Sequence, residues 1–393
     1  MKPTFSIILP IYNAGKTIES CLDSLLRIDF PTERYEVILV DNGSIDGSLE
    51  IMRRYPFRIV RESVKNSFSA RNCGIRNSTG DIIVLTDSDC VVDPGWLKAF
   101  EASFSDNEVM ACGGKIVSYP PKNAVEAYPS KIKAHNNEVS ILESPLFLPW
   151  IDTANAAYRR TVFDELGFFD DIHFDVTGDI DMGWRTSLHG YKIEYSERAL
   201  VQHINRSTLK ALMRQYGQYG YASVRLRKKY RYYYENVLML KDYGTWWEIN
   251  HIGKILFHSL RNLFKKMDLN NLILCYIQLC VGMAHMSGMK QEMKSPRMIS
   301  ADRDALEKVE PKPLKSGYIV WGRDDERNLY NFETETKMVV NEFGLYILDH
   351  IRNKSPFESI VESACMEWDV DKETIEADVK DFTTQLQLSG FMV

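Results

Sequence analysis

The sequence predicts an α/β protein with a mostly parallel central sheet, and two observations support this prediction. First, short apolar runs suited to buried strands alternate with segments whose apolar residues recur at helical spacing. Strands that alternate with helices in this way form a parallel sheet with helices on both faces. Second, polar turn residues follow three of the apolar runs, at the sheet edge where such folds bind their ligands.

The alternation can be followed element by element through the first part of the chain. In chain order we expect a strand at 5–11, a helix with Ile18, Cys21, Leu22, Leu25 and Leu26 on one face, a strand at 35–40, a helix, a strand at 57–60, a helix at 69–77 and a strand at 82–86. Turn residues from Asp41 to Ser44 end the second strand. We expect this α/β domain to comprise residues 1–206.

Residues 207–290 are expected to form a helical extension. Eight basic residues and no acidic ones lie between Arg206 and Arg231, with tyrosines interleaved. Two interpretations are open: a solvated helical face, or a surface for the anionic phosphates of membrane headgroups or of a substrate diphosphate. Residues 269–289 are strongly apolar but include asparagine, glutamine and histidine, which would be costly inside a bilayer. We therefore expect a helix there that packs on the protein or lies in the plane of the membrane surface. Any contact of this helix with a membrane would be peripheral.

Two segments complete the chain. Residues 291–315 are rich in charge, proline and serine, a composition typical of a linker. Residues 316–393 are expected to form a small winged-helix-like α+β domain of three short strands followed by three helices. Its expected strands are 318–321, 329–332 and 338–340, and its expected helix caps are Asn341, Ser355 and Asp371.

Composition and charge exclude several classes of protein. There are 48 Lys and Arg residues against 54 Asp and Glu, a formal net charge of −6, which argues against a nucleic-acid partner. The seven cysteines include no CxxC pair, so neither a zinc knuckle nor a disulfide framework is expected. The N-terminus lacks an apolar core followed by a cleavage site, so we expect a cytoplasmic protein, free or peripheral at the inner face of the membrane.

The most informative motif is Asp87-Ser88-Asp89, which directly follows the apolar strand at 82–86. Two carboxylates one residue apart at the end of a strand can share a divalent cation through oxygen ligands. Such a cation would neutralise a substrate diphosphate and the charge that develops on it as it leaves. Taken alone the motif is weak, because acidic turns after strands are common.

Further motifs lie at the same edge of the expected sheet. Pro10-Ile11-Tyr12-Asn13 leaves the first strand, Asp41 ends the second, and Ser69-Ala70-Arg71-Asn72 opens a later helix. Together with Asp87-Ser88-Asp89, these motifs resemble those of the inverting family 2 glycosyltransferases, which use the GT-A nucleotide-sugar-binding fold. The resemblance spans residues 4–225 and rests on several ordered motifs, so it is specific.

This resemblance implies roles on the donor side. The implied donor-binding residues are Pro10, Tyr12, Asn13, Asp41, Arg71, Asp87 and Ser88. Pro10 and Tyr12 would border the nucleobase, and Asp41 would accept a hydrogen bond from a uracil N–H, which implies a UDP-sugar. Arg71 would approach the base or the diphosphate, and Asp87 the ribose.

Asp89 would bind Mg²⁺ or Mn²⁺ on the diphosphate, with His203 as a second metal ligand. Simple packing for Tyr12, an Asx turn for Asp41 and a turn for Asn13 remain open.

A second group of residues resembles the acceptor side of the same family. The implied acceptor-side residues are Asn155, Asp181, Trp184 and Arg185. Family members usually carry a Glu-Asp pair followed by an Arg, and counting back from Arg185 places the Glu at Gly178 and the Asp at Asp179. The Glu is therefore missing, while Asp179 is the implied general base that removes the acceptor proton in an inverting transfer. Asp181 remains open as a helix N-terminal carboxylate or a substitute base.

Residues 316–393 resemble the PqqD-like peptide-binding domains, also called RiPP recognition elements. The resemblance rests on the three strands, the helix start at Asn341, the Ser355-Pro356-Phe357 motif and the last helix. Members bind a leader peptide as an added strand between the third strand and the last helix. The implied peptide-binding residues are Met338, Val339, Val340, Ile375, Val379 and Phe382.

Two alternatives remain open for residues 316–393: a winged-helix-like packing domain or a dimerisation module. Because Ser355 to Val393 holds nine acidic and two basic residues, DNA is not expected to bind here, and a basic or amphipathic peptide is.

The leading hypothesis is a metal-dependent inverting glycosyltransferase of the hexosyltransferase type, with a C-terminal domain that delivers a ribosomally made peptide to the site. Two alternatives stay open. One is an enzyme that extends a polysaccharide or a lipid-linked glycan at the membrane surface. The other is a non-catalytic peptide-binding scaffold, for which Gly178 is the only support. The sequence selects neither the sugar nor the modified residue.

Overall fold

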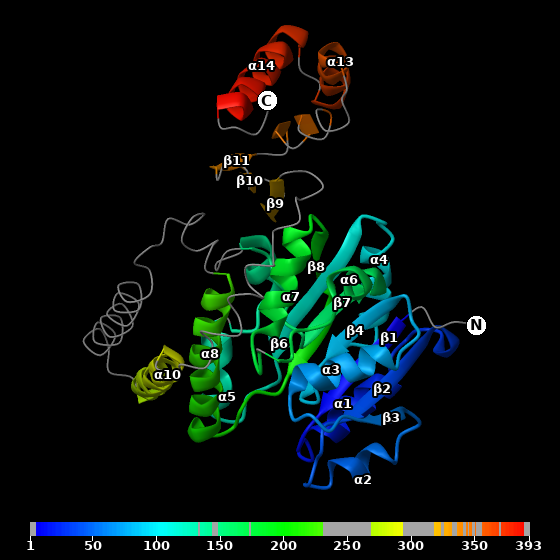
Figure 1. Ribbon diagram of the computed structural model, residues 1–393, viewed down its shortest axis with the longest axis vertical. Coiled ribbons are helices and arrows are strands. Elements are labelled where there is room, and N and C mark those ends of the chain that lie inside the picture. The colour runs from blue at the N-terminus through cyan, green and yellow to red at the C-terminus, as the bar shows by residue number, and fades with distance from the viewer. Residues whose placement is uncertain are drawn as a thin grey trace.

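Figure 1 shows the computed structural model, which describes the chain in several stretches. They are residues 5–132, 134–143, 148–172, 174–230 and 269–293, and in the C-terminal part 318–323, 326–331, 336–340, 343–344, 346–347, 350, 356–368 and 371–388. The predicted linker at 291–315 lies outside them beyond Met293, and so do the predicted caps Asn341 and Ser355.

An eight-stranded sheet forms the centre of the N-terminal part (Figure 1). Its strands are β1 (Phe5–Ile11), β2 (Tyr35–Asp41), β3 (Arg58–Arg61), β4 (Ile82–Thr86), β5 (Cys90–Val92), β6 (Val109–Ser118), β7 (Asn155–Arg159) and β8 (Lys192–His203), in the spatial order β3-β2-β1-β4-β7-β6-β8-β5. Strands β3, β2, β1 and β4 are parallel, as are β6 and β8, whereas β7 and β5 run antiparallel to their neighbours. The predicted α/β class with a mostly parallel sheet is therefore confirmed.

Helices cover both faces of this sheet. They are α1 (Ile18–Leu26), α2 (Ser48–Met52), α3 (Ser67–Arg76), α4 (Trp96–Ser103), α6 (Arg160–Leu166) and α7 (Gly178–Leu188). Successive side chains of a strand point to opposite faces, so one buried strand serves two cores. On β1, Phe5 and Leu9 join the apolar cluster that contains α1, whereas Ile8 joins the cluster that contains α3. This double burial explains why β1 is apolar throughout.

Several predicted elements have the bounds that the sequence suggested. The strands predicted at 5–11 and 82–86 are confirmed as β1 and β4. Helix α3 starts at Ser67 instead of residue 69, because the side chain of Asn66 caps it and accepts a hydrogen bond from the Phe68 N–H at 2.7 Å. The cap matters for the site, because it sets the position at which α3 presents its polar residues.

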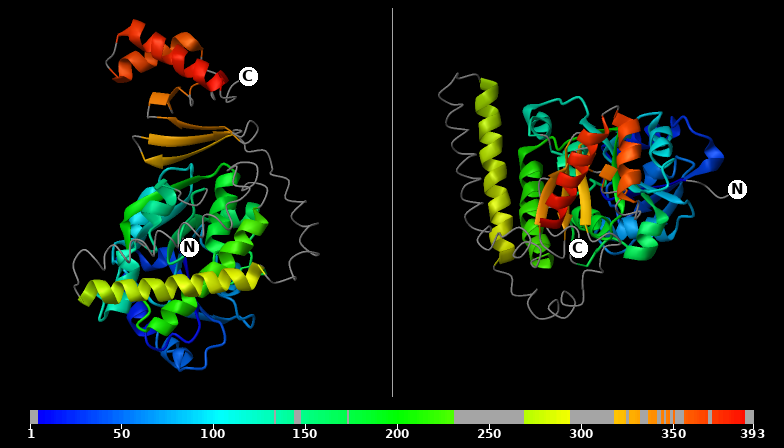
Figure 2. Two further views of the ribbon diagram at one scale, coloured as in Figure 1. Left: turned by 90° about the vertical axis from the view of Figure 1, so that its left-hand side faces the viewer. Right: turned by 90° about the horizontal axis from the view of Figure 1, so that it is seen from above.

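A helical extension packs beside the sheet, built from α5 (Ala124–Lys131), α8 (Leu209–Lys229) and α10 (Leu269–Met293) (Figure 2). The backbones of α8 and α10 touch at glycines. A Cβ atom on Gly220 would lie 2.0 Å from the His285 carbonyl oxygen, and one on Gly288 would lie 1.9 Å from that of Gly217. Among the described helices, none has the length and apolar character needed to cross a bilayer.

The C-terminal part contains a three-stranded antiparallel sheet and two described helices longer than one turn (Figure 2). These elements are β9 (Tyr318–Arg323), β10 (Glu326–Asn331), β11 (Thr336–Val340), α13 (Phe357–Trp368) and α14 (Lys372–Leu388). The predicted cap Asp371 is confirmed, since its side chain accepts from the Thr374 N–H at 2.9 Å. Strand β10 begins at Glu326 instead of Leu329. The order of strands and helices agrees with the predicted small α+β unit.

Candidate active site

A cavity of about 960 Å³ opens at the carboxyl edge of the parallel strands. Eight of the residues predicted for donor binding, metal binding and catalysis line it: Pro10, Tyr12, Arg71, Asp87, Ser88, Asp89, Asp179 and His203. They come from the end of β1, from α3, from the turn after β4, from the start of α7 and from the end of β8. Segments far apart in sequence are thus brought to one cavity.

Arg71 and Asp87 form an ion pair in the wall of the cavity. The guanidinium also donates to the Ser67 carbonyl oxygen at 3.3 Å and lies 5.2 Å from the centre of the Phe68 ring. Burial raises the pKa of Asp87, and the positive charge of Arg71 opposes that shift. Arg71 Nε is buried without a hydrogen-bond partner among the described residues. The arrangement suits a cation that is fixed in place toward an anionic ligand.

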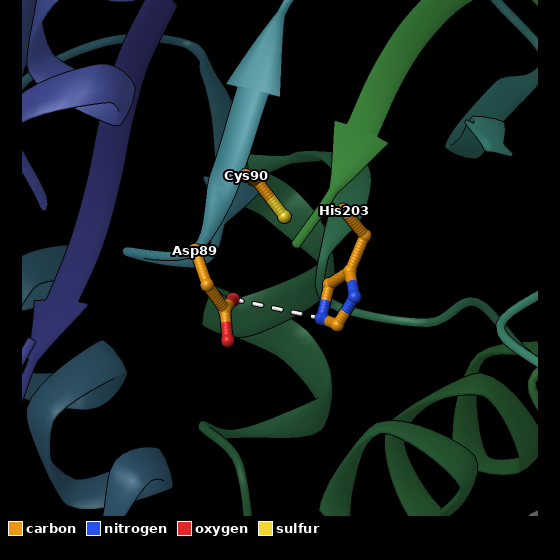
Figure 3. A group of neighbouring side chains, drawn as sticks. All are labelled: Asp89, Cys90 and His203. Carbon is orange, nitrogen blue, oxygen red and sulfur yellow. Dashed lines mark ion pairs between the residues drawn. The ribbon is translucent and has the colours of Figure 1, made fainter. Parts of the chain in front are cut away.

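Asp89 lies between the imidazole of His203, which Figure 3 shows, and the guanidinium of Arg206. Its Oδ1 is 3.5 Å from His203 Nε2, and its Oδ2 is 3.1 Å from Arg206 Nη1. The other ring nitrogen of His203 lies 3.0 Å from Asn205 Oδ1, which orients the imidazole. The sequence predicted Asp89 and His203 as metal ligands, and it included Arg206 only among the eight basic residues of the stretch from Arg206 to Arg231.

A divalent cation would find ligand atoms at Asp89, Cys90 and His203, which lie within 4.8 Å of one another (Figure 3). A carboxylate oxygen suits Mn²⁺ and Mg²⁺, whereas an imidazole nitrogen suits a transition metal such as Mn²⁺, so this pair fits Mn²⁺ better than Mg²⁺. Cys90 does not strengthen the site. Burial raises the pKa of its thiol well above the usual range, and a protonated thiol is a poor ligand for a hard cation.

A second histidine, His135, was not found from the sequence. Its Nδ1 lies 2.6 Å from Asp152 Oδ2, and its ring stacks on that of His203 with centroids 4.9 Å apart. Burial alone would lower the pKa of His135, but the Asp152 carboxylate outweighs burial and raises it to about 9. The same pair lowers the pKa of Asp152 to about 2 against the effect of burial. Both residues line the cavity, so it contains a fixed ion pair beside the metal ligands.

Asp179 lies in the first turn of α7 and faces the cavity. Burial and then the charge of Asp152 raise its pKa to about 7, although Arg71 and the Ile180 N–H, which donates to it at 2.9 Å, oppose the shift. Thr177, just before α7, has a left-handed backbone with φ +66°, and its hydroxyl is buried without a partner among the described residues. Uncommon backbone of this kind is concentrated at functional sites.

Gly178 occupies the position where the family's Glu was expected. A Cβ atom there would lie 2.7 Å from the ring of Phe68, which stacks on Phe169 at 5.3 Å. The missing side chain is therefore explained by packing, because an aromatic ring fills the space that it would need.

Restoring the Glu should destabilise the protein. We expect Gly178→Glu and Gly178→Ala each to lower the free energy of unfolding by about 2 kcal/mol, the usual cost of overpacking. Chemical denaturation would measure the effect. In the Phe68→Ala background, either change should lower the free energy of unfolding by less than it does in the wild type, because the two sites are in contact. Wild-type stability in Gly178→Ala would contradict the packing explanation.

The four predicted acceptor-side residues do not line the cavity. Asn155 is buried and links neighbouring elements: it accepts from Trp96 Nε1 at 2.8 Å and donates to the Lys115 and Ala199 carbonyl oxygens. Asp181 is buried between Arg185, Lys229 and Tyr230, and these cationic and hydroxyl partners lower its pKa against the effect of burial. The structure thus places Asn155 and Asp181 in the scaffold of the site.

Trp184 and Arg185 are also structural in position. Trp184 is fully buried and donates to the Leu148 carbonyl oxygen at 3.1 Å, while Arg185 donates to the Leu166 and Phe168 carbonyl oxygens. The Leu148 bond holds the segment that carries Asp152 against α7. Both side chains therefore position cavity residues, and neither lines the cavity itself.

Two predicted donor-side residues shape the loop beside the cavity. Asn13 has φ +50° and accepts from the Ile45 N–H at 2.9 Å, and Asp41 accepts from the Ser44 N–H at 3.0 Å. The Asp41 side chain thus accepts from the N–H three residues on and closes the turn after β2, a structural role related to the Asx turn that the sequence left open. Neither side chain lines the cavity, although Asn42, the residue after Asp41, does.

Three of the eight basic residues between Arg206 and Arg231 turn inward. Arg206 pairs with Asp89, Arg214 lines the cavity, and Lys229 Nζ lies 2.7 Å from Asp181 Oδ1. These placements favour a role at the site over a membrane-facing one for Arg206 and Arg214.

The predicted peptide-binding residues lie on β11 and α14. Strand β11 pairs with β10 through Met338, Val339 and Val340, and it is an edge strand of the described sheet. On α14, Ile375 and Val379 are buried in the core against α13. Ile375 and Val379 therefore pack inside the domain. Of the three residues predicted on α14, Phe382 is the one that stays partly exposed.

Two family models match this chain. Residues 6–167 match the model described as Glycosyl transferase family 2, and residues 326–392 match the model described as Coenzyme PQQ synthesis protein D (PqqD). The two matches correspond to the sheet domain and to the C-terminal unit.

Relatives and a solved structure agree with the first match. Glycosyltransferase AglE of Haloferax volcanii is 30% identical over 222 residues, which cover 54% of this chain and 71% of AglE. Poly(ribitol-phosphate) beta-glucosyltransferase of Bacillus spizizenii is 30% identical over 148 residues, 36% of this chain and 23% of that longer protein. The mannosyltransferase PcManGT from Pyrobaculum calidifontis, solved with GDP-Man and Mn²⁺, has a TM-score of 0.54 at 18% identity and covers 75% of this chain and 88% of its own. That structure shows the same fold.

Proposed function

Because the chain belongs to glycosyl transferase family 2, whose enzymes take nucleotide-sugar donors, we propose that it transfers a sugar with inversion from a UDP-sugar to a ribosomally synthesised peptide. The N-terminal part has the GT-A nucleotide-sugar-binding fold. The peptide acceptor is proposed from the PqqD match together with the edge strand β11.

On the donor side, Tyr12 and Pro10 would contact the base, and Arg71 would hold the diphosphate. Asp89 and His203 would hold a Mn²⁺ or Mg²⁺ ion, whose charge would neutralise the departing nucleoside diphosphate. Arg206 contacts Asp89 and can add a second positive charge next to the same phosphates. This grouping of cations at one end of the cavity supports the proposed donor orientation.

The transfer itself would depend on Asp179. Its carboxylate would take the proton of the acceptor while the acceptor atom bonds to the anomeric carbon. The bond between that carbon and the diphosphate oxygen would break on the opposite side, so the configuration inverts. The pKa of Asp179 at about 7 supports the assignment, because a base works best when its pKa lies near the working pH.

The C-terminal domain would capture the leader of the peptide. An unpaired strand edge can accept an added strand through main-chain hydrogen bonds. Among the described strands, β11 offers such an edge. Tethering the leader would raise the local concentration of the peptide core at the cavity.

The test uses the full chain, Mn²⁺, a panel of nucleotide sugars and the short peptide encoded beside the gene. We expect a mass increase of one hexose on the peptide, and a KM for a leaderless peptide higher by roughly two orders of magnitude. Equal KM values with and without the leader would contradict capture by the C-terminal domain, even if transfer occurs.

A second candidate acceptor is a polyol-phosphate or another glycan. It is favoured by the poly(ribitol-phosphate) transferase among the relatives and by Arg214, a cation that lines the cavity. Transfer to a glycan preparation, with none to the peptide in the same assay, would select this alternative.

A further inference from the structure

One long helix forms a polar wall of the cavity. The residues of α8 that line it are Ala211, Arg214, Gln215, Gln218, Tyr219 and Ser223, and they share one face of the helix. The other face is apolar and packs Leu212 and Tyr216 against Tyr128 of α5 and Ile277 of α10. The family model matches residues 6–167, so this wall lies beyond the segment that the model covers.

Tyr219 is held in a defined orientation within this wall. Gln215 Nε2 donates to its hydroxyl oxygen at 2.8 Å, and its ring lies edge-on to Tyr216 with centroids 5.5 Å apart. The phenol can therefore donate its own proton into the cavity. Burial, and then the charges of Asp152, Tyr216 and Asp179, raise its pKa, so the hydroxyl keeps that proton at neutral pH.

Asp179 and Tyr219 complement each other chemically. Both line the same cavity, and the charge of Asp179 influences Tyr219. An attacking hydroxyl group needs one acceptor for its proton and can accept one hydrogen bond on its oxygen. Asp179 provides the acceptor, and Tyr219 provides the donor. A thiol sulfur is a weak hydrogen-bond acceptor and would gain little from the phenol.

We propose that Tyr219, oriented by Gln215, binds the attacking hydroxyl group beside Asp179, and that the modified residue of the peptide is a serine or a threonine. This inference rests on the proposed transfer to a peptide. In the reaction, the side-chain oxygen bonds to the anomeric carbon, its proton passes to Asp179, and the carbon–diphosphate bond breaks to release the nucleoside diphosphate. Tyr219 keeps its proton throughout.

The test compares Tyr219→Phe with Tyr216→Phe, which removes the same hydroxyl group from the apolar face of the same helix. Two reactions are measured in the full chain with Mn²⁺: hydrolysis of the UDP-sugar, in which water attacks, and transfer to peptides with Ser or Cys at the modified position. We expect Tyr219→Phe to lower kcat/KM about tenfold for hydrolysis and for the Ser peptide, the effect of one lost hydrogen bond. UDP binding by calorimetry should be unchanged in both variants.

The outcomes separate this inference from the proposed function. If the wild type hydrolyses the donor with the expected dependence on Tyr219 but modifies no peptide, the peptide acceptor is wrong and the role of Tyr219 stands. If Tyr219→Phe matches Tyr216→Phe in both reactions, the role of Tyr219 is wrong. If the wild type prefers the Cys peptide, the assignment of a hydroxyl nucleophile is overturned.

Discussion

Replacement of Asp179 by Asn is expected to slow sugar transfer about a thousandfold without weakening nucleotide-sugar binding. The amide has nearly the same shape as the carboxyl but cannot take the proton of the acceptor. The loss should therefore appear in kcat and leave the Kd for the donor unchanged. Steady-state kinetics together with calorimetry of donor binding would measure both quantities.

The pH dependence should identify the same group. Since transfer needs the carboxylate, the wild-type rate should rise as pH increases through about 7, the pKa of Asp179 in the cavity, and Asp179→Asn should lack this rise. Folding raises that pKa from 3.8, so the carboxyl favours the folded state only at low pH, and this contribution is lost as pH rises through about 7. Asp179→Asn should thus be at least as stable as the wild type at pH 8. A variant that keeps wild-type kcat would rule out Asp179 as the base.

Replacement of Asp89 by Ala is expected to weaken metal-dependent donor binding by roughly a hundredfold and to abolish measurable transfer. Asp89 is the carboxylate shared by His203 and Arg206, so its loss removes a metal ligand and leaves two cationic or basic side chains without their anionic partner. Titration of Mn²⁺ in the presence of UDP would report the change in metal affinity.

Asp29→Ala provides the matched control for this variant. Asp29 pairs with Lys98 on the surface, and exposed pairs of this kind contribute little to stability. Thermal unfolding of both variants would separate loss of metal from loss of fold. Full transfer by Asp89→Ala in the presence of a chelator would show that the donor binds without a metal ion.

The sequence was sufficient for the parallel half of the sheet because three of its four strands, β1, β2 and β4, are largely buried on both faces. Strands β1 and β4 are continuous apolar runs, and their ends carry the residues that meet at the cavity. The antiparallel insertion of β7 between β4 and β6 could not be predicted, since strand order depends on long-range pairing. That insertion is what brings Asp152, just before β7, next to Asp179.

The site was predicted less completely than the fold. Motifs located Asp87, Asp89 and Asp179, because short-range patterns record where a strand or a helix ends. They failed for His135, whose partner Asp152 lies seventeen positions later in the sequence. For Trp184 and Arg185, which do not line the cavity, the acceptor-side role stays a prediction, since a motif does not distinguish a side chain that contacts a ligand from one that holds the neighbouring backbone.

The glycine contacts between α8 and α10 have a consequence for evolution. Because the two backbones touch at Gly217, Gly220 and Gly288, the pair can behave as one rigid unit whose cavity-facing side chains are free to vary. The residues proposed to bind the donor come from the ends of strands and from α3, and none of them lies on α8 or α10. New acceptors could therefore be acquired by changing a single helical face, while the chemistry of the donor is inherited intact.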